Sequence, residues 1–385
     1  MRIQSLANAG LLIEADGVRL LCDPWFTDGA YQGAWAIWPQ PLTNPVMDIG
    51  KVDAIYISHI HPDHYDQTFL RQYLQQWGYT PILCGLLSLC EALRADGFPS
   101  AVVAPNGNIK NYVHYRIVPN TSRLEPSEVT IEGREPIDTA LALRCGGDSL
   151  INMNDNPFHS EQVRALLSFC GGPPTVAYLP FAGASSFPQR FPHAPSGEAD
   201  KKKRICLERF RTYADTLQPH YAVPFAGEYW LQGPLAQYNH LRGQADATEA
   251  VDLAKQAVLP AAGAWFDTAT GQASAVRTVP YDAQQAQDEI AARGFTGYAY
   301  ERDYPEWPYV ACDLARLKQE ARWAAETRLG RTLEMPSVEM DQRYFAGLLT
   351  GRYHWNDALI SSHVQYHLPP NAEPSVYEAL EEWHL

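Results

Sequence analysis

The chain has 385 residues, of which 46% are hydrophobic and 19% are charged, an ordinary globular composition with enough apolar residues for a large core. The formal net charge of −14 argues against a nucleic-acid-binding groove, and no apolar run approaches the ~18 residues of a membrane-spanning helix. The seven cysteines are scattered, odd in number and without a C-x-x-C pair, a pattern typical of reduced thiols. We therefore expect a cytoplasmic protein with neither nucleic-acid nor membrane partners.

The first part of the chain alternates strands with helices. Apolar alternation, with Asp16-Gly17 as a hairpin turn, predicts strand pairs before residue 23. The stretch 25–50 is rich in Trp and Pro, and we expect an ordered loop where binding residues gather. The periodicity then predicts helices at 66–78 and 86–96, and a strand at 81–84.

A second alternation follows in the middle of the chain. Strands are expected between 109 and 151, at 176–179 and at 221–224, with helices at about 160–170 and 200–217. After residue 260 the pattern changes, and it predicts helices at roughly 284–294, 310–330 and 338–350 and a strand at 361–368. We interpret 1–260 as one domain and 261–385 as a C-terminal subdomain.

Four metal-capable side chains fall within six residues, directly after the apolar run 54–57: His59, His61, Asp63 and His64. His59 and His61 alternate along an extended backbone and therefore point to one side, whereas Asp63 and His64 can serve a second ion. Four polar groups beside a core strand are costly without a partner, and imidazole with carboxylate suits zinc or non-haem iron. The motif therefore predicts a metal site.

This H-x-H-x-D-H motif, with Asp23-Pro24-Trp25 after a short strand, resembles the metallo-β-lactamase superfamily. Further stretches are similar to the metallo-β-lactamase-like region of CMP-N-acetylneuraminate hydroxylases: 22–25, 55–59, 181–188, 217–219, 224–227 and 349–356. The resemblance implies an α/β fold, a four-layer αββα sandwich over 1–260 with a mostly helical C-terminal extension packed on the metal face. Those hydroxylases carry a Rieske cluster, and this sequence has no Rieske ligand pattern, so an oxygenase of this kind would need an external electron donor.

The resemblance also implies where the remaining ligands of a binuclear site lie. The bridging aspartate is best placed at Asp155, after an apolar strand. At the two later histidine positions the chain has carboxylates instead, Glu135 (with Asp138 second) and Glu228. The implied metal set is His59, His61, Asp63, His64, Glu135, Asp155 and Glu228, with His354 and His363 as alternatives to the two glutamates.

Two enzymatic functions compete, and a degenerate protein that binds without chemistry is a third reading. Extra carboxylate ligands favour iron, hence a binuclear non-haem iron oxygenase acting on a small polar metabolite, with anionic and nucleotide-linked compounds among the candidates. The alternative is a binuclear metallohydrolase of phosphodiesterase or lactonase type, in which zinc or manganese lowers the pKa of a shared water. Asp63 and Asp155 are the expected catalytic residues in either case. Expected substrate contacts are Trp25 and Phe187 as aromatic walls, and Arg190, Arg352 and His354 as polar groups.

Overall fold

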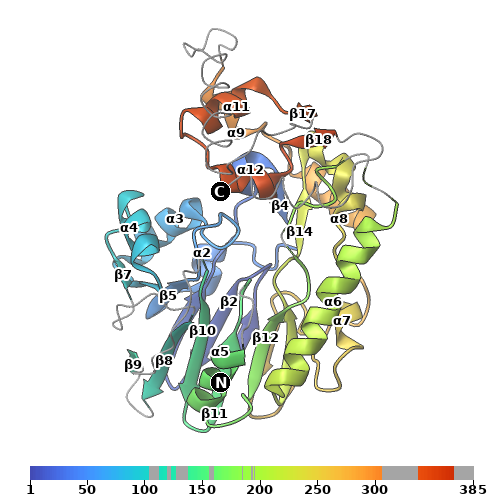
Figure 1. Cartoon of the computed structure of the whole chain (residues 1–385). Helices are drawn as coiled ribbons and strands as arrows, with labels where there is room; N and C mark the ends of the chain where they lie inside the picture. Colours follow the sequence, from blue (N-terminus) through green and yellow to red (C-terminus); the bar gives the residue numbers. More distant parts are fainter. Residues whose placement is uncertain are drawn as a thin grey trace.

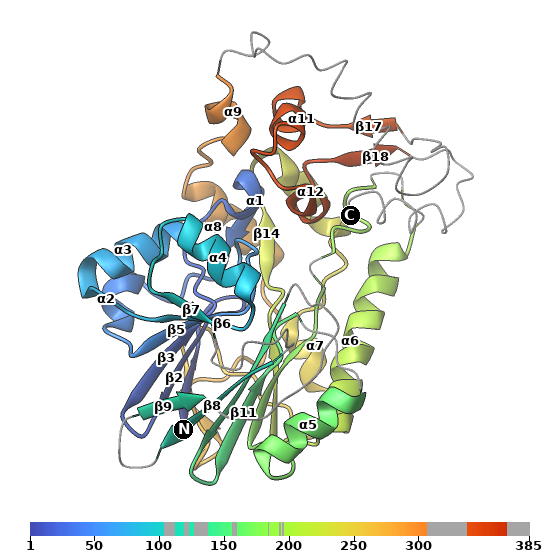
Figure 2. The same cartoon turned by 60° about the vertical axis from the view of Figure 1, so that its left-hand side comes forward.

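The computed structural model describes residues 1–103, 112–118, 123–126, 138–155, 160–183, 185–191, 194, 196–305 and 337–367, and every structural statement below concerns these residues. Two β-sheets pack face to face, with helices on the outer side of each (Figures 1 and 2). This is the expected four-layer αββα sandwich, with the described helices of the C-terminal region above one end of it (Figure 1).

The first sheet has the strand order β16-β15-β1-β2-β3-β5-β6-β7. Strands β3, β5, β6 and β7 are parallel, so their carboxyl ends meet at one edge, whereas β1 and β2 pair antiparallel with their neighbours. The strands are β1 (Arg2–Ser5), β2 (Leu11–Ala15), β3 (Val18–Cys22), β5 (Ala54–Ile57), β6 (Ile82–Cys84), β7 (Ala101–Val103), β15 (Trp265–Asp267) and β16 (Gln272–Ala273).

The second sheet has the order β13-β12-β11-β10-β8-β9. Its strands are β8 (Tyr112–Val118), β9 (Arg123–Pro126), β10 (Ala140–Cys145), β11 (Asp148–Asn152), β12 (Val176–Pro180) and β13 (Tyr221–Phe225). Strands β11, β12 and β13 are mutually parallel, so the chain that leaves β11 lies at the same sheet edge as the chain that leaves β13.

Strand alternation explains how the layers are held together. Ile13 and Leu20 point into the core between the two sheets, while their neighbours Leu12 and Leu21 point to the outer face. This parity follows from the period of two in a pleated strand, and it gives the first sheet two apolar faces. The outer face is covered by α2 (Pro45–Ile49), α3 (Gln67–Trp77) and α4 (Leu87–Ala95), and the second sheet is covered by α5 (Ser160–Cys170), α6 (Glu198–Leu217) and α7 (Ala247–Val251).

An aromatic cluster joins the C-terminal region to the loop after β3. It contains Trp35 and Tyr229, stacked 3.4 Å apart, and the buried Tyr344 and Tyr366. The elements around it are α1 (Ala30–Gly33), β4 (Trp35–Ile37), β14 (Tyr229–Leu231), η1 (Gly233–Leu241), α8 (Ala283–Ala292), α9 (Ala299–Asp303), β17 (Ser337–Glu339), α11 (Gln342–Leu349), α12 (Trp355–Ser361) and β18 (Gln365–His367).

The predicted elements with strong periodicity are confirmed, and the short ones were missed. Helices α3, α4, α5 and α6 and strands β6, β12 and β13 lie within a few residues of their expected positions. The stretch 25–50, expected as a loop, contains α1, β4 and α2, and the expected C-terminal strand is shorter than predicted and follows an unexpected helix, α12. The helix expected at 310–330 lies outside the described residues. The division at residue 260 stays a prediction, although β15 pairs with β1 and extends the first sheet beyond it.

Among the described helices none is both long and apolar enough to cross a membrane.

Candidate metal centre

The H-x-H-x-D-H motif occupies the loop that leaves β5 at the carboxyl edge of the first sheet. Asp23 leaves the neighbouring parallel strand β3 at the same edge and is fully buried. Its backbone N–H donates to the carbonyl of Tyr56 (2.9 Å), and its Oδ1 accepts from the Ser58 N–H (2.7 Å). The carboxylate thus fixes the start of the loop, which carries the histidines toward the second sheet.

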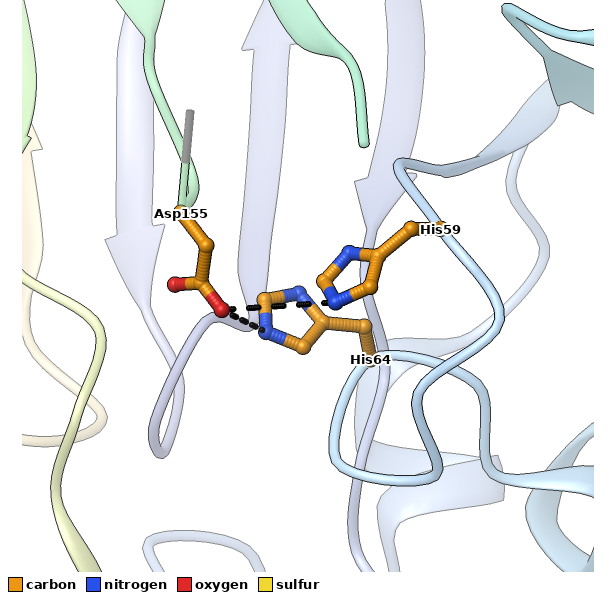
Figure 3. Close-up of side chains that lie close together, drawn as sticks. All are labelled: His59, His64 and Asp155. Atoms are coloured by element: carbon orange, nitrogen blue, oxygen red, sulfur yellow. Dashed lines mark ion pairs between the residues drawn. The ribbon is translucent and has the colours of Figure 1, made fainter. Parts of the chain in front are cut away.

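The structure brings His59, His64 and Asp155 together, with one ligand atom of each within 4.8 Å of the others. Figure 3 shows the Asp155 carboxylate, from the chain that leaves β11, facing both rings. Asp155 Oδ2 lies 3.6 Å from His64 Nε2 and 4.0 Å from His59 Nε2. His61 Nδ1 is 2.7 Å from His59 Nε2, and Asp63 Oδ2 is 3.5 Å from His64 Nε2, so five of the seven predicted metal ligands lie next to one another.

The far nitrogens of two rings are held by acidic partners. His59 Nδ1 lies 2.9 Å from Ser58 Oγ and 3.3 Å from Asp138 Oδ1, while His64 Nδ1 lies 3.3 Å from Asp23 Oδ2. A carboxylate at one ring nitrogen keeps the proton there and leaves the other nitrogen free, which is the usual outer arrangement of metal-binding histidines. The donor set, imidazole nitrogens with ionised carboxylates, therefore fits metal ions of the zinc or iron type.

Asp63 is held by two neutral donors that sequence patterns did not reveal. The Tyr31 hydroxyl donates to Oδ1 (2.7 Å), and Asn8 Nδ2 donates to Oδ2 (3.1 Å). Asn8 Oδ1 in turn accepts from the backbone N–H of Gly227 (2.9 Å). These contacts tie the motif loop to α1 and to the turn after β13, and no local motif around either residue indicated them.

The charges of the site favour a bound cation. Burial by itself lowers the pKa of His64, but Asp63 and Asp155 outweigh it and hold the pKa well above its ordinary value. Burial, with the neighbouring His59, lowers the pKa of His61. Burial opposes ionisation of Asp155, but His64 outweighs it and lowers the pKa of this carboxyl. Without metal, protons on the rings partly balance these carboxylates, and a metal cation can replace them.

Glu228, a predicted ligand, lies outside the His59–His64–Asp155 group. Its carboxylate pairs with Arg277 Nη2 (2.6 Å), and Arg277 Nη1 pairs with Asp246 (2.9 Å). The turn before it is tight, because Gly227 has a φ of 98° and a Cβ there would lie 2.5 Å from the Cβ of Ala182. This turn places Glu228 beside the guanidinium, so its role as a ligand stays a prediction.

The other candidates for completing the site are placed as follows. Glu135 lies outside the described residues. His363 is buried among tyrosine rings, its Nε2 lies 3.1 Å from the carbonyl of Tyr31, and burial lowers its pKa to about 4. His354 is the N-cap of α12, where its ring accepts from a backbone N–H, and it too lies outside the group of three.

A cavity of about 670 Å³ opens beside the metal-facing histidines. Two regions of the chain line it: Trp25, Tyr31, His59 and His61 from the first part, and Arg352, His354, Asn356 and Asp357 from the turn before α12 and the first residues of that helix. The expected substrate residues Trp25, Arg352 and His354 are therefore at the cavity. Phe187 and Arg190 are not among its described lining, and Arg190 is buried over the rings of Phe191 and Tyr366.

The comparisons with known proteins agree with this fold. Residues 2–135 match the family model described as a β-lactamase superfamily domain. The cytidine monophosphate-N-acetylneuraminic acid hydroxylase of Mus musculus is 26% identical over 250 residues, covering 62% of this chain and 41% of the hydroxylase. A Rieske 2Fe-2S iron-sulfur protein of Mycolicibacterium smegmatis is 39% identical over 76 residues, 20% of this chain and 14% of that protein. The chain thus spans less than half the length of these relatives.

Two solved structures are similar at low scores. An isothiocyanate hydrolase from Delia radicum gut bacteria has a TM-score of 0.42 at 15% identity, covering 69% of this chain and 99% of that one. A mutant of the CmlA β-hydroxylase has a TM-score of 0.38 at 15% identity, covering 58% of this chain and 45% of that one. Scores this low carry no weight for function.

The αββα layers, the match over residues 2–135 and the clustered histidines and aspartate at the sheet edge have one common explanation. The chain has the metallo-β-lactamase fold, with a candidate metal centre at the sheet edge.

Proposed function

We propose that the protein is a binuclear non-haem iron oxygenase that acts on a small polar metabolite. The observation that carries this is the ligand balance of the centre. Among the described residues, three imidazoles and two carboxylates face the site, while Glu228 after β13 is a carboxylate paired with Arg277. A set of imidazoles with ionised carboxylates is one that non-haem iron takes. The hydroxylase name of the Mus musculus relative supports the same choice.

Each residue of the centre has a distinct part. His59 and His61 would hold one ion, and His64 and Asp63 would hold the other. Asp155 would serve both, since its carboxylate lies within 4.0 Å of a nitrogen of each pair. When bound, the ions supply O2 binding and activation, with electrons from an external donor. Asp23 and Asp138 keep the ring protons of His64 and His59 on Nδ1, so that both Nε2 atoms stay available.

The cavity supplies positioning and limits the substrate class. Trp25 and Tyr31 line the metal side of the cavity with aromatic rings, against which an apolar part of a substrate would pack. The guanidinium of Arg352 is already paired with Asp303 (2.7 Å), so an anionic substrate group must share it. Asp357 accepts from Gln32 (2.9 Å) and can accept in addition from a hydroxyl or amino group. We infer a hydroxyl- or amine-bearing metabolite, with any anionic group directed toward Arg352.

A second candidate function is a binuclear metallohydrolase, because imidazole with carboxylate also suits zinc or manganese. In that reaction Asp63 would orient the attacking water. Its two hydrogen bonds, from Tyr31 and Asn8, already fix the plane of the carboxylate.

The test is elemental analysis and turnover of protein purified without added metal. As an oxygenase, the full chain should contain iron and consume O2 only when an external reductant is supplied, and the zinc-loaded form should be inactive because zinc has no redox chemistry. Anaerobic cleavage of an activated phosphodiester or lactone by the zinc form would overturn the proposal in favour of the hydrolase.

A further inference from the structure

We propose that Asn356, on the first turn of α12, is a positioning residue of the metal centre that sets which nitrogen of His61 carries the proton. The inference rests on the proposed metal-binding role of His61. It assigns to the C-terminal region a function in building the centre, although the described ligand cluster comes from the two sheets.

The contact itself is specific. Asn356 Nδ2 lies 2.8 Å from His61 Nε2, across 295 residues of sequence. An amide nitrogen can only donate, so His61 Nε2 accepts and the single proton of the neutral ring is on Nδ1. Nδ1 lies 2.7 Å from His59 Nε2, which can accept that proton because His59 carries its own on the side of Asp138.

Two further contacts hold Asn356 in place. His354 caps α12, and its Nδ1 accepts from the Asn356 backbone N–H (3.2 Å). The next residue, Asp357, accepts from Gln32 of α1 (2.9 Å), which ties the helix to the loop after β3. The Asn356 amide is thus presented to His61 by a helix anchored on both sides.

An amide is suited to this position because it can either donate or accept. If a metal ion binds His61 through Nδ1, the proton moves to Nε2 and needs an acceptor there. A half-turn of the Asn356 amide puts Oδ1 in the place of Nδ2, and this oxygen accepts a hydrogen bond from the Nε2–H of His61. His59 and His64 differ in this respect, because their partners are carboxylates, Asp138 and Asp23 respectively. A carboxylate can only accept, so it keeps the ring proton on Nδ1. Within the described site, His61 is the ring whose tautomer can change on metal binding.

The first experiment measures zinc affinity of the full chain by competition with a chromophoric chelator. Asn356→Leu removes both donor and acceptor at similar size, and we expect zinc affinity to fall by about 10–100-fold, the usual cost of losing an outer partner. Asn356→Asp keeps an acceptor and should stay close to wild type. Trp355→Phe on the same turn, which keeps an aromatic contact with Phe345, is the matched control and should also bind normally. Melting temperatures of the metal-free variants establish that each is folded.

The second experiment observes the tautomer directly by ¹⁵N NMR of labelled histidine. Metal-free wild type should show His61 protonated on Nδ1, zinc should move the proton to Nε2, and metal-free Asn356→Asp should already show Nε2 protonation. Unchanged zinc affinity in Asn356→Leu, or Nε2 protonation in the metal-free wild type, would overturn the inference. Failure of the wild type to bind any metal would instead refute the proposed function, and the metal-free tautomer still decides this inference.

Discussion

The loop after β5 and the first turn of α12 meet at His61, and they contribute to the centre in different ways. The loop supplies His59, His61, Asp63 and His64 from one short stretch whose backbone sets their directions. The turn of α12 supplies an amide to a ring nitrogen from 295 residues away. Four of the five candidate ligands at the centre therefore come from one local segment, and Asp155 comes from the second sheet. Asn356, which orients one of them, comes from a distant segment, so a mutation should act differently in each region.

The largest effect is expected for His61→Ala, in the loop after β5. We expect loss of metal and of activity with the fold retained, because the two apolar layers of the first sheet do not depend on the ion. Metal analysis and circular dichroism of the purified variant check both parts. An unfolded spectrum would show that the loop is structural and would remove the functional contrast between the regions.

The next effect is the pH dependence of metal binding. Asp63 and Asp155 raise the pKa of His64, so protons compete with the metal at pH values where an ordinary histidine is already neutral. Below this raised pKa, zinc affinity should fall about tenfold for each pH unit. In chelator-treated protein the sign is opposite. When the pKa of a histidine is higher in the folded than in the unfolded state, its proton stabilises the fold. This stabilisation is complete below the unfolded-state pKa of about 6.5, and it is lost as pH rises through the folded-state pKa.

His61 and His363, whose pKa values are lowered, act in the opposite direction, so the contribution of His64 is measured as the difference between wild type and His64→Gln. In the metal-free protein this difference in melting temperature should favour wild type more at about pH 6 than at about pH 8, and in the metal-bound protein the reverse. Calorimetric scans of both forms measure this. Equal slopes with and without metal would mean that His64 is not titrating at the centre.

A smaller effect is expected for Tyr31→Phe, which removes the 2.7 Å hydrogen bond to Asp63 without changing packing. A hydrogen bond to a charged group contributes about 1.5–3 kcal/mol, so metal affinity should fall by roughly tenfold while the aromatic contact with Trp35 persists. Titration of zinc into the variant, beside Tyr344→Phe as a control within the same aromatic cluster, separates loss of the hydroxyl at Asp63 from general disturbance.

The smallest effect is expected for Glu228→Gln. Because the structure pairs Glu228 with Arg277, we expect full metal content and a loss of about 1 kcal/mol in unfolding free energy. Chemical denaturation and metal analysis of one sample give both values. If the variant instead bound about half as much metal as wild type, Glu228 would be a metal ligand, and the turn after β13 would be one of the regions that bind the ions.

The sequence alone determined the features that depend on local backbone geometry. Strand alternation and helical periodicity predicted α3, α4 and α6, and the spacing of His59, His61, Asp63 and His64 predicted that they converge, whereas the layer order came from the family resemblance. These predictions succeed because periods of two and 3.6 residues are set within a few residues, whatever the rest of the chain does.

Only the tertiary structure decided which groups support the ligands. Asp63 is held by Tyr31 and Asn8, and His61 by Asn356, through packing between elements far apart in the chain. The local sequence pattern around these three residues does not predict the contacts. The same holds for Glu228, which stands where the family resemblance implied a ligand but meets Arg277 across 49 residues. The direction of such a side chain is set by sheet pairing and by the aromatic contacts under α12, which exist only once the whole core has formed.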